Sequence, residues 1–284
     1  MKKTFFDSIQ KTLLSETEME TLERDLNFQP VNPESTQTLS AEQIETFNRN
    51  GCLLPLPALE DHETAAYRRL FDRLVEKMMS EGSDSFSLID PHLNHHQVYD
   101  LMFDPRLVAY VKDLVGPDIV CWSTHLFCKL AHDNKQVAWH QDAYYWPLTP
   151  ARTVTVWLAI DDADIENACM QFVAGSHLHG KISHRTSRKE EQNVLRVTVD
   201  GVVETFGQII NAELRAGQIS LHSDLLLHGS GPNRSDRRRC GLTLRYVDAN
   251  VQDLRDWSQC GVLISGQDRR GQWGNPPRPA TTHT

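Results

Sequence analysis

The segment Arg152-Thr-Val-Thr-Val-Trp-Leu-Ala-Ile160 has the period-two arrangement of β-branched and aromatic residues that is typical of a β-strand. Similar segments recur through the second half of the chain, and glycines separate several of them. Many short strands at close intervals predict a barrel or a jelly roll. The other segments with this pattern are Ile119–Leu130, Cys169–Val173, Leu195–Val199, Gln218–Leu221 and Gly241–Val247.

Helical periodicity is found before these strands. Ser40-Ala-Glu-Gln43 has the spacing of a capping box and predicts a helix over Ala41–Asn48. Apolar residues on a single stripe predict two more helices, over Glu63–Met79 and Pro105–Val115. Helices followed by a run of strands indicate an α+β domain.

The chain divides into one large domain and two polar ends. Residues 39–264 hold the predicted core elements and form one domain of ordinary size. Residues 1–38 are mostly polar and end in a Ser/Thr-rich joint, which predicts a loosely attached N-terminal extension. Residues 265–284 are rich in Gly, Pro and Arg, and we expect a flexible C-terminal tail there.

Composition limits the possible partners. The formal net charge is −9 and no long run of Lys and Arg is present, which argues against a nucleic-acid-binding surface. The 6 cysteines include no Cys-x-x-Cys pair, which favours reduced thiols and a cytoplasmic location. No apolar run approaches the about 20 residues that a membrane span requires. We therefore expect neither a membrane nor a nucleic-acid partner, and the oligomeric state stays open.

Two His-x-Asp triplets are present, His140-Gln-Asp142 and His222-Ser-Asp224, and the abundance of both residue types makes one of them expected by chance. On a strand, residues two apart share a face and lie about 6.6 Å apart, so both side chains can reach one metal ion. His228 follows Asp224 by about 13 Å of strand, which is too far for a shared ion. It can meet His140 and Asp142 if two distant strands adjoin. We interpret the second triplet as a polar strand start.

His140, Asp142 and His228 would supply two imidazoles and one carboxylate to one face of a metal. With the other positions open, this set is the facial triad of mononuclear non-heme Fe(II) oxygenases. Arg239 follows His228 by eleven residues, and its planar guanidinium is suited to holding the carboxylate of a dicarboxylic co-substrate. The same three ligands also suit zinc.

Four segments resemble the phytanoyl-CoA dioxygenase family, in the family's order and over about residues 38–250. They are the helix over 41–48 with Pro55-Leu-Pro57, Trp139-His-Gln-Asp142, Phe172-Val-Ala-Gly-Ser-His177 and His228-Gly-Ser-Gly-Pro-Asn-Arg-Ser-Asp236. The resemblance implies a double-stranded β-helix, a jelly roll of cupin type, with flanking N-terminal helices. It implies Fe(II), 2-oxoglutarate and O₂ as cofactor and co-substrates, with His140, Asp142 and His228 as the metal ligands.

The same resemblance implies a set of contacts to 2-oxoglutarate. Arg239 stands at the position of the family's carboxylate-binding arginine, and Ser230 at that of an assisting serine. Trp157 and His125 resemble two further co-substrate contacts. Arg237 would share the face of Arg239 on a strand, so an assignment two residues earlier stays open.

Candidates for substrate contacts surround the ligands. The rings of Tyr144, Tyr145 and Trp146 follow the metal loop and could either wall the substrate or fill the core. Gln141 and Lys129 are further candidates. Five histidines have weaker claims: His92, His95 and His96 could line the cavity mouth or be exposed in loops, and His177 and His179 are expected to be loop residues without a ligand role.

The sequence thus predicts an Fe(II)- and 2-oxoglutarate-dependent dioxygenase that hydroxylates a small-molecule metabolite and releases succinate and CO₂. Two alternatives stay open, a cupin-like metal-binding protein and a zinc-dependent hydrolase or isomerase on the same barrel. Arg239 and Ser230 favour the oxygenase, because neither alternative needs a clamp for a co-substrate carboxylate. Asp142 argues against halogenation, because the related halogenases leave that position to chloride.

Overall fold

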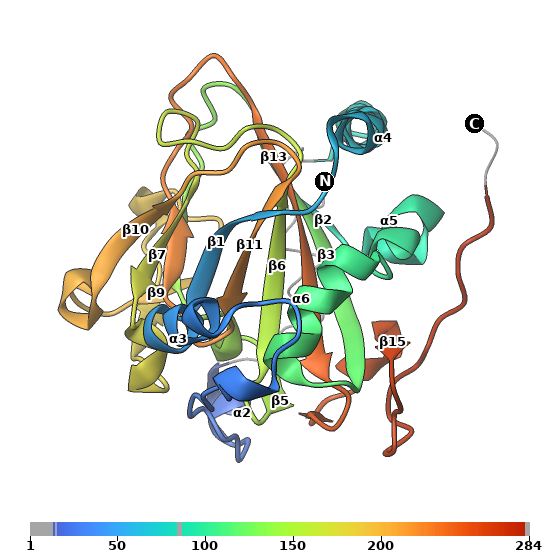
Figure 1. Cartoon of the computed structure of the whole chain (residues 1–284). Coiled ribbons are helices and arrows are strands. Elements are labelled where there is room, and N and C mark those ends of the chain that lie inside the picture. Colours follow the sequence, from blue (N-terminus) through green and yellow to red (C-terminus); the bar gives the residue numbers. More distant parts are fainter. Residues whose placement is uncertain (1–13, 15, 84–86, 282–284) are drawn as a thin grey trace.

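The computed structural model describes residues 14, 16–83 and 87–281 and contains two antiparallel β-sheets that face each other (Figure 1). The larger sheet has the strand order β1-β11-β6-β13-β3-β15, with β2 also paired to β3, and the smaller has the order β10-β7-β12-β4. This is the predicted double-stranded β-helix. The larger sheet consists of β1 (Cys52–Pro57), β2 (Ser87–Ile89), β3 (Ile119–Lys129), β6 (Thr153–Ala159), β11 (Gln218–Ser223), β13 (Arg239–Asp248) and β15 (Val262–Ser265). The smaller consists of β4 (Val137–His140), β7 (Met170–Ala174), β10 (Gln208–Ala212) and β12 (His228–Ser230).

Two short strand pairs lie outside these sheets. They join β5 (Leu148–Thr149) to β14 (Gln252–Asp253) and β8 (His184–Thr186) to β9 (Val197–Val199). The six predicted strand segments all contain a strand, and all of their boundaries agree within two residues. The other strands of the structure were not predicted, and all of them except β1 have five residues or fewer, a length that often shows too little alternation to be recognised.

The helices precede most of the strands, as predicted. They are α2 (Glu16–Glu20), α3 (Ala41–Asn50), α4 (Asp61–Ser80), α5 (His96–Leu101) and α6 (Pro105–Val115). The predicted capping box begins α3: the Ser40 hydroxyl accepts from the Gln43 amide, and the Gln43 side chain accepts from the Ser40 amide. The helix ends at Asn50 and is capped by Gly51, whose φ of 77° lies in the left-handed region that glycine favours.

The two faces of the larger sheet have different surroundings. Its outer face carries Val156, Leu158, Leu242 and Leu244, which form the main hydrophobic core together with side chains from α3, α4, α5 and α6. In Figure 1, α3 and α6 lie against this side of the sheet. Residues at the alternate positions point inward, because successive side chains of a strand face opposite ways. The inner face is therefore free to form a site.

Described residues of both polar ends make contacts with the domain, whereas residues 1–13, 15 and 282–284 of the predicted extension and tail lie outside the described part of the chain. In the N-terminal segment, the Arg24 guanidinium donates to the carbonyls of Ala143 and Trp146 at 2.6 and 2.9 Å. In the C-terminal segment, Trp273 is buried, and its indole N–H donates to the Ala249 carbonyl at 3.0 Å. Further contacts hold the same segments, among them the Val31 amide to the Asn48 side chain and the Arg278 guanidinium to the Asp100 carboxylate. In the described part of the chain, the helices are too short or too polar to cross a membrane.

Candidate metal and co-substrate site

The three predicted metal ligands lie together where β4 and β12 meet. His140 ends β4 and His228 begins β12, and the two residues are register partners in the smaller sheet. Asp142 follows two residues after β4. The Nε2 atoms of His140 and His228 lie 3.6 and 3.9 Å from Oδ1 of Asp142, and the three ligand atoms lie within 4.8 Å of one another. All three side chains are buried. This spacing fits a single divalent ion with metal–ligand distances of about 2 Å.

Backbone carbonyls orient both imidazoles. Nδ1 of His140 donates to the Ala138 carbonyl at 2.9 Å, and Nδ1 of His228 donates to the Leu226 carbonyl at 3.0 Å. Each bond keeps the proton on Nδ1 and turns the Nε2 lone pair toward the common centre, as in metal sites whose histidines are held from behind.

The charge states of these groups also suit a metal. Burial, with His140 beside it, lowers the pKa of His228 to about 4, so this imidazole is neutral at neutral pH. Burial opposes ionisation of Asp142, but the two imidazoles and Arg245 hold the pKa of its carboxyl well below the usual range. Neutral imidazole and ionised carboxylate are the forms that bind metal. The donor set therefore fits Fe(II).

A cavity of about 350 Å³ opens beside the triad. Its floor is the inner face of the larger sheet, where the strand register sets side chains from neighbouring strands side by side. Two adjacent rows of this floor are His125, Thr243 and Trp157, followed by Ser123, Arg245, Thr155 and His222. The cavity is thus shared by the triad on one sheet and by a polar floor on the other.

Arg239 lies at the start of β13 with its guanidinium on this cavity. It is 2% exposed. Its Nε donates to the Ala168 carbonyl at 3.1 Å and its Nη2 to the Ser230 hydroxyl at 3.3 Å, and the Trp157 ring lies 5.6 Å from the guanidinium carbon. Arg239 forms no ion pair with any described residue. A buried positive charge without a counter-charge favours an anionic ligand.

Lys129 lies behind Ser230 and does not line the cavity, so its prediction as a substrate contact is wrong. It is the register partner of Arg239. Its Nζ donates to the Ser230 hydroxyl at 2.8 Å and also to the carbonyls of Ser230 and Gly231. Burial, and then the neighbouring Arg239, lower the pKa of Lys129 to about 6. Lys129 therefore positions Ser230.

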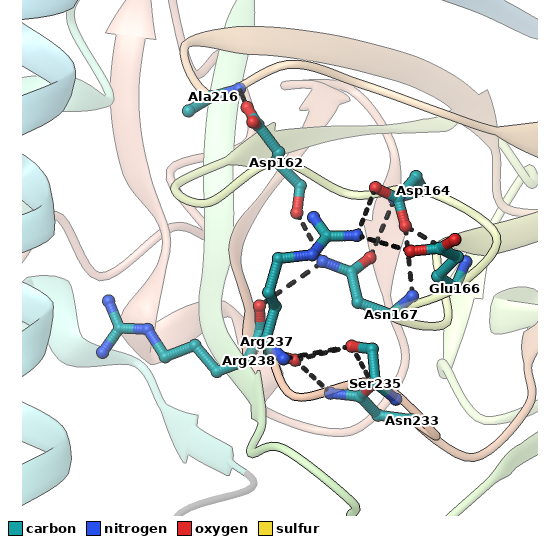
Figure 2. Close-up of polar contacts among 9 residues, drawn as sticks. All are labelled: Asp162, Asp164, Glu166, Asn167, Ala216, Asn233, Ser235, Arg237 and Arg238. Carbon is teal, nitrogen blue, oxygen red and sulfur yellow. Dashed lines mark hydrogen bonds and ion pairs between the residues drawn. The ribbon is translucent and has the colours of Figure 1, made fainter.

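The alternative assignment to Arg237 is resolved by its position. Figure 2 shows Arg237 directed toward Asp164 and Glu166, and its Nη2 lies 2.6 and 3.4 Å from their carboxylate oxygens. Half of the Arg237 side chain is exposed, and the residue precedes β13. Arg238 pairs with Asp161. Among the three consecutive arginines, Arg239 is the one that faces the cavity.

The predicted aromatic contacts divide into two groups. Tyr145 and Trp146 line the cavity, together with Trp157 and His125. Tyr144 does not, and instead its ring lies 4.3 Å from that of His184 on the edge of a smaller cleft. The prediction of Tyr144 as a substrate contact in this cavity is therefore wrong.

Gln141 is a structural residue. Its amide nitrogen donates to the carbonyls of Gly180 and Leu225 at 2.8 and 2.7 Å, and its amide oxygen accepts from the Ile182 backbone at 2.9 Å. These bonds use the side chain fully and lock the loop that carries the metal ligands. The prediction of a substrate contact at Gln141 is not supported by its position.

The remaining histidines have structural surroundings. His92 is buried and bonds the Thr124 hydroxyl and the Cys260 carbonyl, so neither a loop nor a cavity-mouth position applies. His177 is buried as well and donates to the Asn48 carbonyl at 3.0 Å. His95, His96 and His179 do not line the cavity.

Sequence reasoning missed five residues of the cavity floor, namely Ser123, Thr155, His222, Thr243 and Arg245. His222 lies near the end of β11, buried, with its ring 4.9 Å from that of His228, so the polar strand start that we expected is wrong. Arg245 and Thr155 also face the cavity. A signal for Arg245 was present, because it follows Arg239 by an even number of residues on one predicted strand.

Comparisons with known proteins agree with this geometry. The model of the phytanoyl-CoA dioxygenase family matches residues 47–241, a range that includes the triad and Arg239. The peroxisomal phytanoyl-CoA dioxygenase of Bos taurus is 24% identical over 247 residues, which cover 78% of this chain and 73% of that protein.

Two further relatives extend the comparison. A probable alpha-ketoglutarate-dependent hypophosphite dioxygenase of Stutzerimonas stutzeri is 26% identical over 185 residues, which cover 63% of this chain and 64% of that protein. The solved structure of the non-heme monooxygenase ThoJ in its apo form is similar with a TM-score of 0.66 at 27% identity, over 83% of this chain and 87% of that one.

Proposed function

This chain belongs to the phytanoyl-CoA dioxygenase family of Fe(II)- and 2-oxoglutarate-dependent oxygenases, and we propose that it hydroxylates a small organic molecule with release of succinate and CO₂. One observation carries the proposal: the triad and the buried charge of Arg239 open into the same cavity. His140, Asp142 and His228 would hold Fe(II) by one face. The bound ion would supply the redox chemistry that couples decarboxylation of 2-oxoglutarate to oxidation of the substrate.

The residues of this chain would fix the direction of the co-substrate. Arg239 offers a guanidinium edge, and a planar fork can make two parallel charge-assisted bonds to one carboxylate. The Ser230 hydroxyl accepts from Lys129 and Arg239, so its own hydrogen is left to donate to the same carboxylate. Arg239 and Ser230 would thereby hold one end of the dicarboxylate at β13 and direct its other end to the triad.

Water must be kept from the reacting centre for the oxidation to reach the substrate. The three ligands are buried, and the cavity walls beside them are aromatic, from Trp157 to Tyr145 and Trp146. An apolar wall orients one C–H bond of the substrate and limits side reactions.

Two alternatives are disfavoured by particular residues. A zinc hydrolase or a cupin-like binding protein would have no use for the uncompensated charge of Arg239 inside the cavity. A halogenase would need the carboxylate position for chloride, and Asp142 occupies it.

Anaerobic titration tests the proposal. The protein with Fe(II) should develop a visible charge-transfer band when 2-oxoglutarate is added, because the 2-oxo acid then chelates the metal. His140→Ala should abolish the band. Arg239→Ala should weaken 2-oxoglutarate binding by about 30-fold or more, since removing one partner of a buried charge pair costs about 2–5 kcal/mol, while Fe(II) binding is retained.

Arg237→Gln is the matched control. This arginine lies two residues from Arg239 but pairs with exposed carboxylates, so the 2-oxoglutarate affinity of the variant should equal that of the wild type. Absence of the band in the wild type, or a band that survives in His140→Ala, would refute the proposed function. Equal loss of affinity in both arginine variants would refute the assigned co-substrate site.

A further inference from the structure

One row of the cavity floor has polar atoms without partners. Ser123, Arg245, Thr155 and His222 lie side by side on four adjacent strands of the larger sheet. Three buried atoms in this row have no hydrogen-bond partner among the described residues, namely Nε of Arg245, Oγ1 of Thr155 and Nδ1 of His222. Buried polar atoms are nearly always satisfied in a native structure. A row of unsatisfied atoms on a cavity wall therefore indicates a polar ligand group.

Arg245 gives this row a positive charge. Its Nη1 donates to the Ser123 hydroxyl at 3.3 Å, and no carboxylate of the described residues lies within ion-pair distance of its guanidinium. The nearest negative groups have other roles. Asp142 is a metal ligand in the proposed function, and Asp90 accepts from the Ser123 hydroxyl and the Thr124 amide at 2.8 and 3.1 Å. Arginine keeps its proton even when buried, so the charge persists.

Aromatic rings hold this guanidinium in place. Its carbon lies 5.9 Å from the ring of Trp122 and 5.2 Å from that of Trp146. A β-bulge brings Trp122 to the cavity: Arg245 pairs with Ser123 and Tyr246 with Cys121, which leaves Trp122 as the extra residue. Trp257 lines the same part of the cavity. The charge is thus fixed beside an apolar wall.

Arg245 is also separated from the co-substrate clamp. It follows Arg239 by six residues on β13, about 20 Å of strand. In the proposed function, 2-oxoglutarate uses one carboxylate at Arg239 and the other at the metal. Neither is then left for Arg245.

We propose that Arg245 binds a carboxylate of the primary substrate, assisted by the Thr155 hydroxyl, while the apolar or aromatic body of the substrate lies against Trp122, Trp146 and Trp257. The substrate class is a small organic acid. The inference rests on the proposed function, because it is the occupation of Arg239 and the metal by 2-oxoglutarate that leaves Arg245 for the substrate.

Paired probes test this assignment. Phenylacetate, indole-3-acetate and hexanoate are each compared with the neutral amide of the same skeleton, by calorimetric titration of the anaerobic protein loaded with Fe(II) and 2-oxoglutarate. The wild type should bind at least one acid about ten times more tightly than its amide, which corresponds to about 1.4 kcal/mol. Arg245→Gln should reduce this ratio to about one. Arg245→Lys, which keeps the charge but not the fork, should retain part of the preference.

Two controls separate the possible outcomes. Arg152→Gln removes an arginine that pairs with Asp248 outside the cavity, and it should keep the wild-type ratio. The charge-transfer band measures 2-oxoglutarate affinity in each variant. If Arg245→Gln weakens the binding of 2-oxoglutarate as much as the binding of the acids, the carboxylate at Arg245 belongs to the co-substrate and the inference is refuted.

The inference also fails if the wild type shows no preference for any acid over its amide. That result leaves the charge-transfer band intact, so it refutes the inference without touching the proposed function. Absence of the band in the wild type refutes the proposed function instead, and titration of the metal-free protein then decides whether Arg245 binds the acids.

Discussion

Replacing Gly241 by alanine tests how closely the floor beside the co-substrate clamp is packed. Gly241 lies on β13 between the cavity-facing residues Arg239 and Thr243. A Cβ at this position would lie 2.2 Å from Cζ2 of Trp157, and 2.6 and 2.8 Å from two further atoms of that ring. Carbon atoms pack at about 3.5–4.0 Å, so the ring would have to retreat by more than about 1 Å.

The Trp157 ring has little room for such a movement. It is 1% exposed, and the guanidinium of Arg239 lies over it. The backbone of Gly241 is outside the left-handed region, so the strain is purely steric. Overpacking of this kind costs about 1–3 kcal/mol, and we expect Gly241→Ala to lower the free energy of unfolding by that amount.

Urea unfolding of four variants measures this effect. Trp157→Phe removes the ring atoms that the new methyl group meets, so Gly241→Ala should cost less in the Trp157→Phe background, with a coupling energy of about 1 kcal/mol or more. Gly231→Ala is the matched control, because its Cβ would meet no atom within 4 Å, and it should change stability by less than about 0.5 kcal/mol. Additive effects of Gly241→Ala and Trp157→Phe would contradict the packing described for this floor.

Two further predictions concern buried titratable groups. Burial, and then Asp142, raise the pKa of Asp224 to about 7, compared with about 3.9 in an unfolded chain. The stabilising contribution of Asp224 to the free energy of unfolding is therefore fully present below about pH 4 and is lost as the pH rises through 7. The urea stability of the metal-free wild type should fall by up to about 1.4 kcal/mol per pH unit in that window relative to Asp224→Asn, and parallel pH profiles of the two proteins would contradict this. A divalent metal at about 100 times its Kd should stabilise the protein by about 2.7 kcal/mol, and a His228→Ala variant stabilised equally would exclude His228 as a ligand.

The strand positions could be predicted because alternation is a local property. The segment around Trp157 shows it clearly, and strand parity also places Arg239 on the inner face of β13. The meeting of His140 and His228 could not be derived in this way, because it depends on pairing two strands far apart in sequence, one of only three residues. Chemistry and the family resemblance supplied that part of the prediction.

The errors have a common physical origin. Lys129 and Gln141 were predicted as substrate contacts because their positions adjoin the site. Each instead donates hydrogen bonds to backbone carbonyls, and the sequence does not reveal these partners. Arg24 and Trp273 bond to backbone carbonyls of the domain, and composition cannot indicate such contacts. The cytoplasmic location and the domain boundaries stay predictions.

The central claim is that this chain oxidises 2-oxoglutarate with O₂ at the site formed by His140, Asp142 and His228. The most direct test is mass spectrometry of the succinate formed when the Fe(II)-loaded protein reacts with 2-oxoglutarate under ¹⁸O₂. Decarboxylation with O₂ places a single oxygen atom from the gas in succinate, so singly labelled succinate is expected from the wild type and none from His228→Ala. Succinate no more abundant than in the metal-free protein, or succinate without label, would contradict the claim.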